Sequence, residues 1–556
     1  MNLEILKNFC GAIPLNYKFQ EMGGNTIFKI DPNFSPINLY DFWGNAATVN
    51  SFVECANYVA GGWRPNKTTV FDILQIGIIA GSVLLITLLI FKNRKIIREK
   101  SRKVPRKLSL FTKLKSRNFL LIIFPIQVFF IFDYIRTKAV RLPSFIDEYI
   151  TLASNVGFFT SLNYDAGAEF GGNYSVQLTS GPISDLGGVI GWILSNSIYV
   201  SRVSNFFWIY FLQIIFIFLL KKVYFKNVDF LFLMNGLFIL LIPWWIGALY
   251  GIGEIASMII FTNAIYLFQK KRKLSIILFG ISIIFGKYLT IIGFFGFYVA
   301  HIFNEKNIRL IVKDISLFSI PFLTWLTIVN FKYTNGNALT YINNQINFIL
   351  GHQSSGLKED NISFFDNLIS SLANSEFTNW NDYEKIRVLL VPIIFLALIL
   401  KNRKFIDDFF GYIALPLFYS VLMPFIWFWI INPTKWIRLS QHFTVIIIMS
   451  IVYFINFEII KSRFSVLLVI FMLSFFIDNN KYLIGVFIIF VLGITYIHKN
   501  QIPYSKLKFL IIIVIVVDIM IPYFEKSTYG DLSPIIEECK IKLDSSECRY
   551  AYMEDG

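Results

Sequence analysis

Long apolar runs recur from about residue 71 to residue 523, and they constrain the fold more than any other feature of the chain. Many of them are long enough to cross a bilayer as a helix. Apolar residues make up 55% of the chain and charged residues only 16%, which is unlike a soluble domain. Because lipid offers no hydrogen bonds to the backbone, spanning segments must be helical. We therefore predict an all-α polytopic membrane protein.

The formal net charge of +15 is explained by the loops between the apolar runs. The segment from Lys92 to Arg117 carries twelve Lys or Arg residues against one acid, Glu99. Loops rich in Lys and Arg stay on the cytoplasmic side, so this segment is expected inside and the N-terminus outside. The positive charge therefore indicates membrane orientation, and we expect no nucleic-acid partner.

Counting the spans from this loop gives about fourteen transmembrane helices with both chain ends outside. We expect an external N-terminal segment (1–70), a membrane domain (71–523) and an external tail (524–556). No signal peptide is recognised before the first span, because no charged segment followed by an apolar core precedes it. The two long outer loops are 133–205 and 332–386. The spans are expected at about 71–91, 118–132, 206–220, 228–246, 255–269, 315–331, 387–400, 408–431, 441–459, 464–477, 481–497 and 508–523.

The remaining two spans come from the apolar run between Ser275 and Phe303, which is too long for one ordinary span and contains a lysine at its centre. We interpret it as two short helices that meet at the outer surface near Gly286-Lys287-Tyr288. The basic run Lys401–Lys404 is expected to be an inner loop between two other spans.

The cysteines are consistent with this topology. The chain contains Cys10, Cys55, Cys539 and Cys548, and all four fall in segments that the charge rule places outside. Disulfides persist in oxidising compartments. The pairs Cys10–Cys55 and Cys539–Cys548 are plausible, and two other connectivities remain open.

The outer loop 133–205 contains the acidic residues that first suggest chemistry. Asp147 and Glu148 follow a span directly, and one of them can face a cavity while the other pairs with a base. A carboxylate there can act as a general base or hold a divalent metal. Tyr164 and Asp165, further along, are candidates for contact with substrate.

Further candidates lie between apolar runs. Placing the ionisable Glu254 so close to a bilayer costs free energy, and such groups usually face a cavity or a partner. Lys287 has the same character, although snorkelling to the interface would also explain it. Arg438, with His442 shortly after it, lies on the outer side just before a span. The planar guanidinium of Arg438 can bind two oxygens of a phosphate or of a lipid headgroup.

No phosphate-binding glycine loop of the nucleotide type is present. An enzyme that works outside the membrane would lack a cytosolic nucleotide donor and would need an activated substrate carried by lipid. A polyprenyl-phosphate sugar satisfies this requirement: the lipid lies between helices, its phosphate meets Arg or Lys, and the sugar meets the acidic loop.

Several short motifs follow one another along the chain. They are Asp147-Glu148-x-x-x-x-Leu152-Ala153, Ser180-Gly181-Pro182, Gly187-Gly188, Gly191-Trp192, Arg202, Asn205, Gly253-Glu254 with Ala256, Gly286-Lys287-Tyr288 and Arg438. Their order and topology resemble the GT-C glycosyltransferases, the superfamily of protein O-mannosyltransferases and aminoarabinose transferases. The resemblance covers roughly 118–300 well and 301–450 loosely.

The resemblance implies a membrane transferase that uses a polyprenyl-phosphate sugar donor, usually with inversion at the anomeric carbon, and an active site built from outer loops. Asp147 would match the catalytic acid of the first outer loop, and Glu254 the acid in the outer turn before a span. Lys287 and Arg438 would match donor-phosphate ligands, while Arg202 would be structural. The chain departs from the family in beginning with an external segment and one additional span.

The expected function is therefore transfer of a sugar to an acceptor hydroxyl of a glycan, glycolipid or protein at the outer face of a membrane. We expect the catalytic residues Asp147, Glu148 and Glu254, and His442 beside the donor phosphate. The cofactor expected is a divalent metal ion at Asp147 and Glu254, or none. A bacterial plasma membrane with the site facing the periplasm is the expected location. An O-antigen-type polymerase or ligase, and a lipid or solute transporter, remain alternatives.

Overall fold

The computed structural model describes fifteen helical or strand elements, and helices take up 83% of the described residues. The structure describes residues 36–40, 46–50, 55, 58, 146–161, 180–195, 198–224, 251–305, 307–332, 339, 342, 343, 346, 382–432, 437–460, 462, 465, 466, 468, 469 and 472. The expectations for Cys10, Tyr164, Asp165, Cys539 and Cys548, and for the spans before residue 146, lie outside these described residues.

The coarse prediction of a helical membrane protein is confirmed. Four described helical segments are long and apolar enough to cross a bilayer: Val200–Tyr224, Ile308–Ile328, Ala414–Ile431 and Arg438–Asn456. Three shorter apolar helices accompany them.

Two helices form the centre of the bundle. Every residue of α10 (Glu254–Leu267) and of α18 (Gln441–Asn456) is buried, and the two helices pack against each other. A helix that is hydrophobic on all sides is a buried one, and most residues of both helices are apolar, although Glu254, Asn263 and His442 are among the polar exceptions. A hydrogen bond of 2.7 Å from the Tyr453 hydroxyl to Asn263 Oδ1 joins the two helices.

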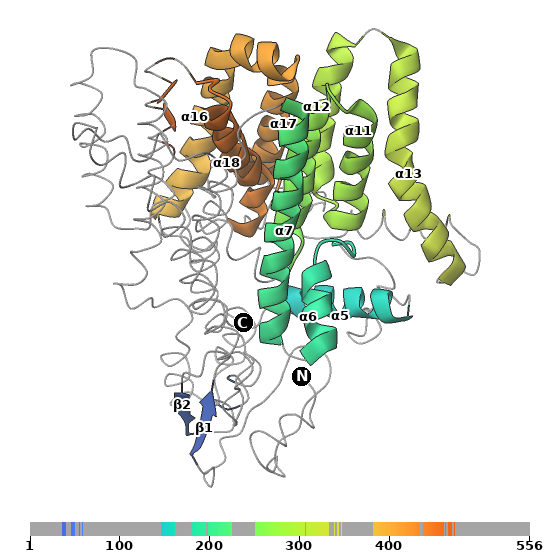
Figure 1. Ribbon diagram of the computed structural model, residues 1–556, viewed down its shortest axis with the longest axis vertical. Coiled ribbons are helices and arrows are strands. Elements are labelled where there is room, and N and C mark those ends of the chain that lie inside the picture. The colour runs from blue at the N-terminus through green and yellow to red at the C-terminus, as the bar shows by residue number, and fades with distance from the viewer. Residues whose placement is uncertain are drawn as a thin grey trace, which may run out of the picture.

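Five further helices, which are labelled in Figure 1, each pack against α10 or α18. They are α7 (Ile198–Tyr224), α11 (Arg272–Ile281), α12 (Thr290–Asn304), α16 (Asp382–Phe410) and α17 (Ala414–Ile426). Outside them, α13 (Ile308–Lys332) packs against α11. Only 17% of the apolar window of α13 is buried, so most of this helix is available to lipid.

Two predicted boundaries have opposite outcomes. The predicted break near Gly286-Lys287-Tyr288 is confirmed: α11 continues as a π-helical turn, η2 (Ser282–Gly286), Lys287 is extended, and α12 begins at Thr290. The predicted inner loop at Lys401–Lys404 is wrong, because α16 runs through it to Phe410. Lys and Arg are good helix formers, so a basic run does not end a helix.

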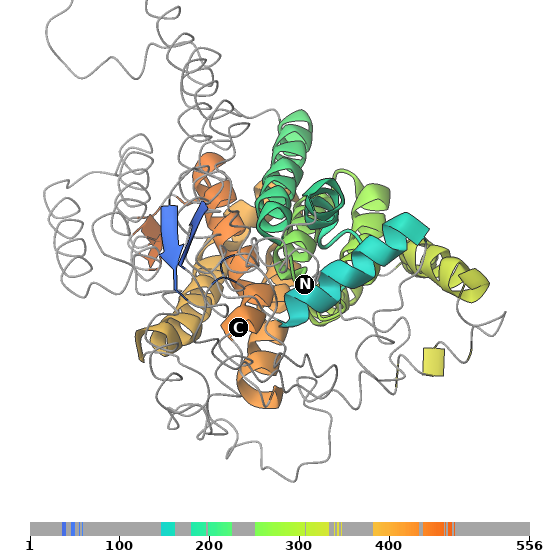
Figure 2. The ribbon, with the colours of Figure 1, turned by 90° about the horizontal axis from the view of Figure 1, so that it is seen from below.

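The helices α5 (Ile146–Ser161) and α6 (Leu186–Ser195) lie at the lower end of the bundle in Figure 1. Seen from below, α5 lies across this end rather than along the bundle (Figure 2). We call this end the site end. Two short antiparallel strands, β1 (Ile37–Tyr40) and β2 (Ala46–Val49), precede these helices in the chain and pair with Ile37 opposite Val49.

The opposite end of the bundle is basic. An aromatic cluster of Tyr224, Phe410 and Phe457 joins the ends of α7, α16 and α18 there, with ring centroids 5.2–5.7 Å apart. Lys221 and Lys222 lie in the last turn of α7, beside this cluster. The alternating direction of the helices therefore places basic residues of separate loops at one end, which we call the basic end.

Candidate functional site

A carboxylate and an ammonium group meet at the site end. Lys287 Nζ lies 3.3 Å from Glu254 Oε1, and the two side chains are 7% and 0% exposed. The contact is an ion pair that lacks hydrogen-bond geometry, because neither oxygen of Glu254 has a hydrogen-bond partner. The structure thus brings together two residues that the sequence singled out separately.

Lys287 also binds two oxygen atoms of other segments. Its Nζ donates to Ser180 Oγ at 2.9 Å and to the Ile252 carbonyl at 2.9 Å. The Ser180 hydroxyl donates to the same carbonyl at 2.8 Å. These two hydrogen bonds and the ion pair with Glu254 tie the Lys287 ammonium group to Ser180 and to the turn that precedes α10.

The backbone at this site is held by a close approach of two segments. The Gly181 amide donates to the Gly286 carbonyl at 2.6 Å, and the Ile183 amide to the Phe285 carbonyl at 2.9 Å. A Cβ on Gly181 would lie 2.6 Å from the Ile284 carbonyl oxygen. Glycine is needed here because only a residue without a side chain lets the two backbones come this close.

A second glycine pair shapes the turn that presents Glu254. Gly251 and Gly253 have φ angles of 64° and 93°, a region that favours glycine. Glu254 is the first residue of α10, where the positive end of the helix dipole favours a carboxylate. Asp185, which is 3% exposed, lies where a Cβ on Gly251 would be, with Oδ1 2.3 Å from that position.

His442 and Arg438 complete the site end. Arg438 belongs to the 3-10 turn η5 (Ile437–Ser440), and His442 is the second residue of α18. The His442 side chain is buried, and neither ring nitrogen has a hydrogen-bond partner.

The first-loop acids remain predictions. Asp147 and Glu148 lie in the first turn of α5, but their side chains are outside the described part of the structure. Four residues after Asp147, Thr151 is buried, and so are Leu152 and Asn155 on the same helix.

The residues near Glu254 do not fit a divalent metal. The Lys287 ammonium occupies the region beside Oε1, and a second cation there would be repelled. No group of three His, Cys, Asp or Glu side chains gathers among the described residues. We therefore derive no step through a metal at Glu254.

Sequence reasoning missed Ser180 and Asp185 as site residues. Ser180 was quoted within a family motif, but its contact with Lys287 joins residues that are 107 positions apart. Asp185 lies next to Gly188 as well as Gly251. The glycine pairs were the available signal, because a glycine often marks a place where another group approaches closely.

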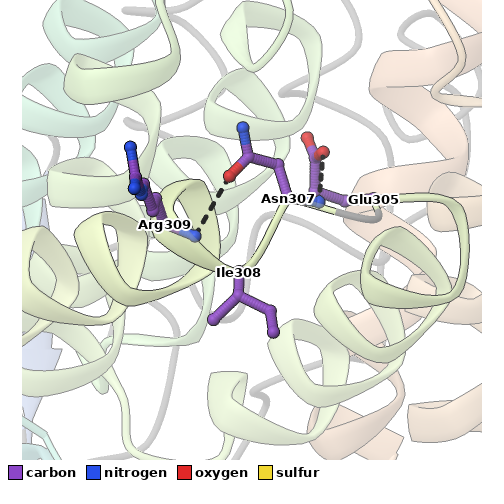
Figure 3. Close-up of a pocket in the computed structure, with 4 residues that line it drawn as sticks. All are labelled: Glu305, Asn307, Ile308 and Arg309. Carbon is purple, nitrogen blue, oxygen red and sulfur yellow. Dashed lines mark hydrogen bonds between the residues drawn. The ribbon is translucent and has the colours of Figure 1, made fainter.

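A shallow depression occurs at the far end of α12 and α13, lined by Glu305, Asn307, Ile308 and Arg309 (Figure 3). The Asn307 Oδ1 accepts from the Arg309 amide at 3.1 Å, and Glu305 Oε1 accepts from the Asn307 amide at 3.2 Å. Both side chains cap the start of α13. The depression therefore lies over a helix cap, and two of its acceptor oxygens, Glu305 Oε1 and Asn307 Oδ1, are already in use.

The remaining sequence expectation that the structure touches is the disulfide. Cys55 is buried and disulfide-bonded, and its partner lies outside the described residues. Comparison with known proteins gives no further identification: the sequence matches no family model, and no curated protein or solved structure matches it significantly. The class defined by the fold is a helical membrane protein.

Proposed function

We propose that the protein transfers a sugar from a polyprenyl-phosphate donor to an acceptor hydroxyl at the site end of the bundle. The observation that carries this proposal is the buried Glu254–Lys287 pair, held at a break between helices at the end opposite the basic residues. Buried ionisable groups at membrane depth usually belong to functional sites. By the positive-inside rule the basic end faces the cytoplasm, so the site faces outward, as in a bacterial plasma membrane.

The proposed roles follow the chemistry of each group. Asp147 takes the proton from the acceptor hydroxyl as that oxygen attacks the anomeric carbon, and the lipid phosphate leaves. Arg438 stabilises the negative charge on the departing phosphate, because preorganised positive charge is most effective where charge develops. Lys287 adds to the positive potential of the site, while its hydrogen bonds hold Ser180 and Ile252 in place and its charge pairs with Glu254.

The first experiment measures consumption of radiolabelled polyprenyl-phosphate sugars by the purified protein in liposomes. The wild type should consume at least one donor, and Asp147→Asn should still bind it but lose turnover by about 100-fold or more, as expected for a lost general base. The matched control is Asn307→Ala, which changes a helix cap at the basic end and should leave turnover unchanged. Failure of the wild type to consume or bind any donor of a broad panel would refute the proposal.

A transporter is the second candidate, and the interrupted helix favours it. The chain passes from α11 through η2 to an extended Lys287 before α12 begins, and transporters commonly bind ions and substrates at such breaks. Uptake assays with the same vesicles separate the two functions, because a transporter moves solute without consuming a donor.

A further inference from the structure

Helix α6 packs against α7 through two glycines. A Cβ on Gly187 would collide with the Ser204 carbonyl oxygen, and a Cβ on Gly191 would lie 2.6 Å from the Val200 carbonyl oxygen. Glycines four residues apart let two helix backbones approach closely, and this spacing is typical of helices that pack inside a membrane. The contact between α6 and α7 therefore resembles a contact between membrane helices.

The register of this contact places α6 beside the first half of α7. Gly187, the second residue of α6, lies against Trp208, whereas Gly191 lies against Val200. Just before α6 begins, the Ile183 carbonyl accepts a hydrogen bond of 3.0 Å from Trp208 Nε1. Helix α6 therefore begins well along α7 and runs back, antiparallel, toward the start of α7.

Helix α7 also provides a scale of depth. Its spanning segment is Val200–Tyr224, and the exposed Lys221 and Lys222 in its last turn mark the membrane boundary at the basic end. A hydrocarbon layer of about 30 Å corresponds to about 20 helical residues, so the other boundary falls near Ser201. At about 1.5 Å per residue, Trp208 lies roughly 10 Å inside that boundary. The start of α6, which lies beside Trp208, is at a similar depth.

The exposed side chains of α6 suit lipid. They are Ile190, Ile193 and Leu194, all apolar and at least half exposed. Phe211 and Ile215 of α7 are exposed as well, and they belong to a helix that crosses the bilayer. Apolar surface in water costs about 25 cal/mol per Å², a cost that acyl chains remove. At this depth, acyl chains therefore fit the exposed residues of both helices.

The segment that leads into α6 also suits this depth. Non-helical backbone is tolerated inside a membrane where protein buries it. The Gly181 and Ile183 amides donate to carbonyls of the break between α11 and α12, and Ser180 is buried. Because Ser180 also binds Lys287, the Glu254–Lys287 pair lies at the inner tip of the loop that α6 forms with this segment.

We propose that α6 is a re-entrant half-helix in the leaflet at the site end, which is the outer leaflet by the positive-inside rule. Acyl chains of this leaflet cover Ile190 and Ile193, and the Glu254–Lys287 pair is held below the membrane surface. This part of the predicted outer loop 133–205 then lies in lipid and not in water. The placement holds whether the protein transfers sugars or moves solutes.

The test uses nitroxide spin labels on single cysteines introduced into the full-length protein in liposomes. Power saturation compares contact of each label with oxygen, which concentrates in lipid, and with a nickel chelate, which stays in water. Labels at Ile190→Cys and Ile193→Cys should contact oxygen more than nickel. Phe211→Cys on α7 is the lipid reference, and Tyr412→Cys, in the turn between α16 and α17, is the water reference. The parent protein measures labelling of the native cysteines.

The depth of the label along α6 is the sharper readout. A label at Leu194→Cys should lie roughly 6 Å nearer to water than one at Ile190→Cys, since four residues rise by about 1.5 Å each. Because the substituted side chains are exposed, these changes leave the packing of α6 in place. Equal depth of the two labels would show that α6 lies flat on the membrane surface and would overturn the proposal.

Two other results would also overturn it. Nickel contact of the Ile190→Cys label equal to that of the water reference would place α6 outside the membrane. Little contact of this label with either reagent would show that protein, and not lipid, covers α6.

Discussion

At the scale of single residues, the site depends on groups that lie far apart in the chain. Lys287 contacts Ser180, which is 107 positions away, and also Ile252 and Glu254, which lie in the turn that leads into α10. The sequence predicted Glu254 and Lys287 as individual candidates because ionisable residues are rare between apolar runs. It could not predict their pairing, because the distance between side chains depends on how helices pack and not on a local pattern.

The Glu254–Lys287 pair should be much more important for stability than an exposed ion pair. Lys287→Met leaves Glu254 buried without its counter-charge and should lower the free energy of unfolding by about 3–5 kcal/mol. Adding Glu254→Gln to Lys287→Met should recover part of this loss. The measurement is thermal unfolding in detergent micelles.

The control for this prediction is the pair formed by Arg403 and Asp407, whose side chains are 54% and 16% exposed. Arg403→Met should change the free energy of unfolding by less than about 1 kcal/mol, as is usual for surface pairs. Equal effects at the two pairs would contradict the structural importance of the buried one.

At the scale of elements, one hydroxyl of α10 makes three polar contacts with the interruption between α11 and α12. Ser257 Oγ of α10 donates to the Ser282 carbonyl at 2.5 Å, lies 2.7 Å from Thr290 Oγ1 and accepts from the Lys287 amide at 3.2 Å. The sequence indicated this interruption through Gly286 and the central lysine. The hydroxyl that supports it was not recognised, because a serine in an apolar helix has no distinctive local signal.

Replacing Ser257 should therefore loosen the break. Ser257→Ala leaves a buried carbonyl and a buried amide with fewer partners, and it should reduce stability by about 1–3 kcal/mol. Ser316→Ala removes an exposed hydroxyl that bonds only its own helix, at the Val312 carbonyl, and should have almost no effect. Thermal unfolding of both variants checks the difference, and similar values would argue against the role of Ser257.

A second element-scale prediction concerns pH. Arg272 binds Glu305 at 3.1 Å and Asp314 at 2.7 Å, linking α11 to the start of α13. The Arg272 hydrogen bond, helped by the Asn307 amide, holds the pKa of Glu305 below its ordinary value of 4.5. A depressed carboxyl pKa stabilises the fold above the ordinary pKa, and this contribution is lost as the pH falls through the folded-state value.

Acidification should consequently affect the wild type more than Glu305→Gln. The melting temperature of the wild type should exceed that of the variant at neutral pH, and the difference should shrink as the pH falls below 4.5. Scanning calorimetry or fluorescence melting over this range measures it. A difference that stays constant with pH would show that the Glu305 charge contributes nothing.

At the scale of the whole molecule, the described helices have two chemically different ends. The predicted alternation of loops places Lys222, Lys270 and Arg309 at one end and Glu254 and Lys287 at the other, and the helix contacts agree with that arrangement. The positive-inside rule alone was sufficient to predict these two ends, because each basic loop independently indicates which end of its helices is cytoplasmic. The end of α16 was mispredicted because the same rule carries no information about helix termination.

The orientation in the membrane is tested by labelling single cysteines. Leu194 is 78% exposed at the site end, and Ile308 is 74% exposed at the basic end. A membrane-impermeant maleimide should label Leu194→Cys in intact cells and Ile308→Cys only after permeabilisation. The parent protein, whose Cys55 is already disulfide-bonded, measures background labelling. The reverse pattern would invert the topology and place the site inside.

The Glu254–Lys287 contact also bears on how the chain enters the membrane. Glu254 begins α10, Lys287 directly follows the α11–η2 unit, and these two helical units pack against each other. Inserted alone, either helix would expose an ionised group to the hydrocarbon layer at a cost of several kcal/mol. Entering together as a hairpin, each would meet its counter-charge before it met lipid. The contact thus favours paired insertion of these helices.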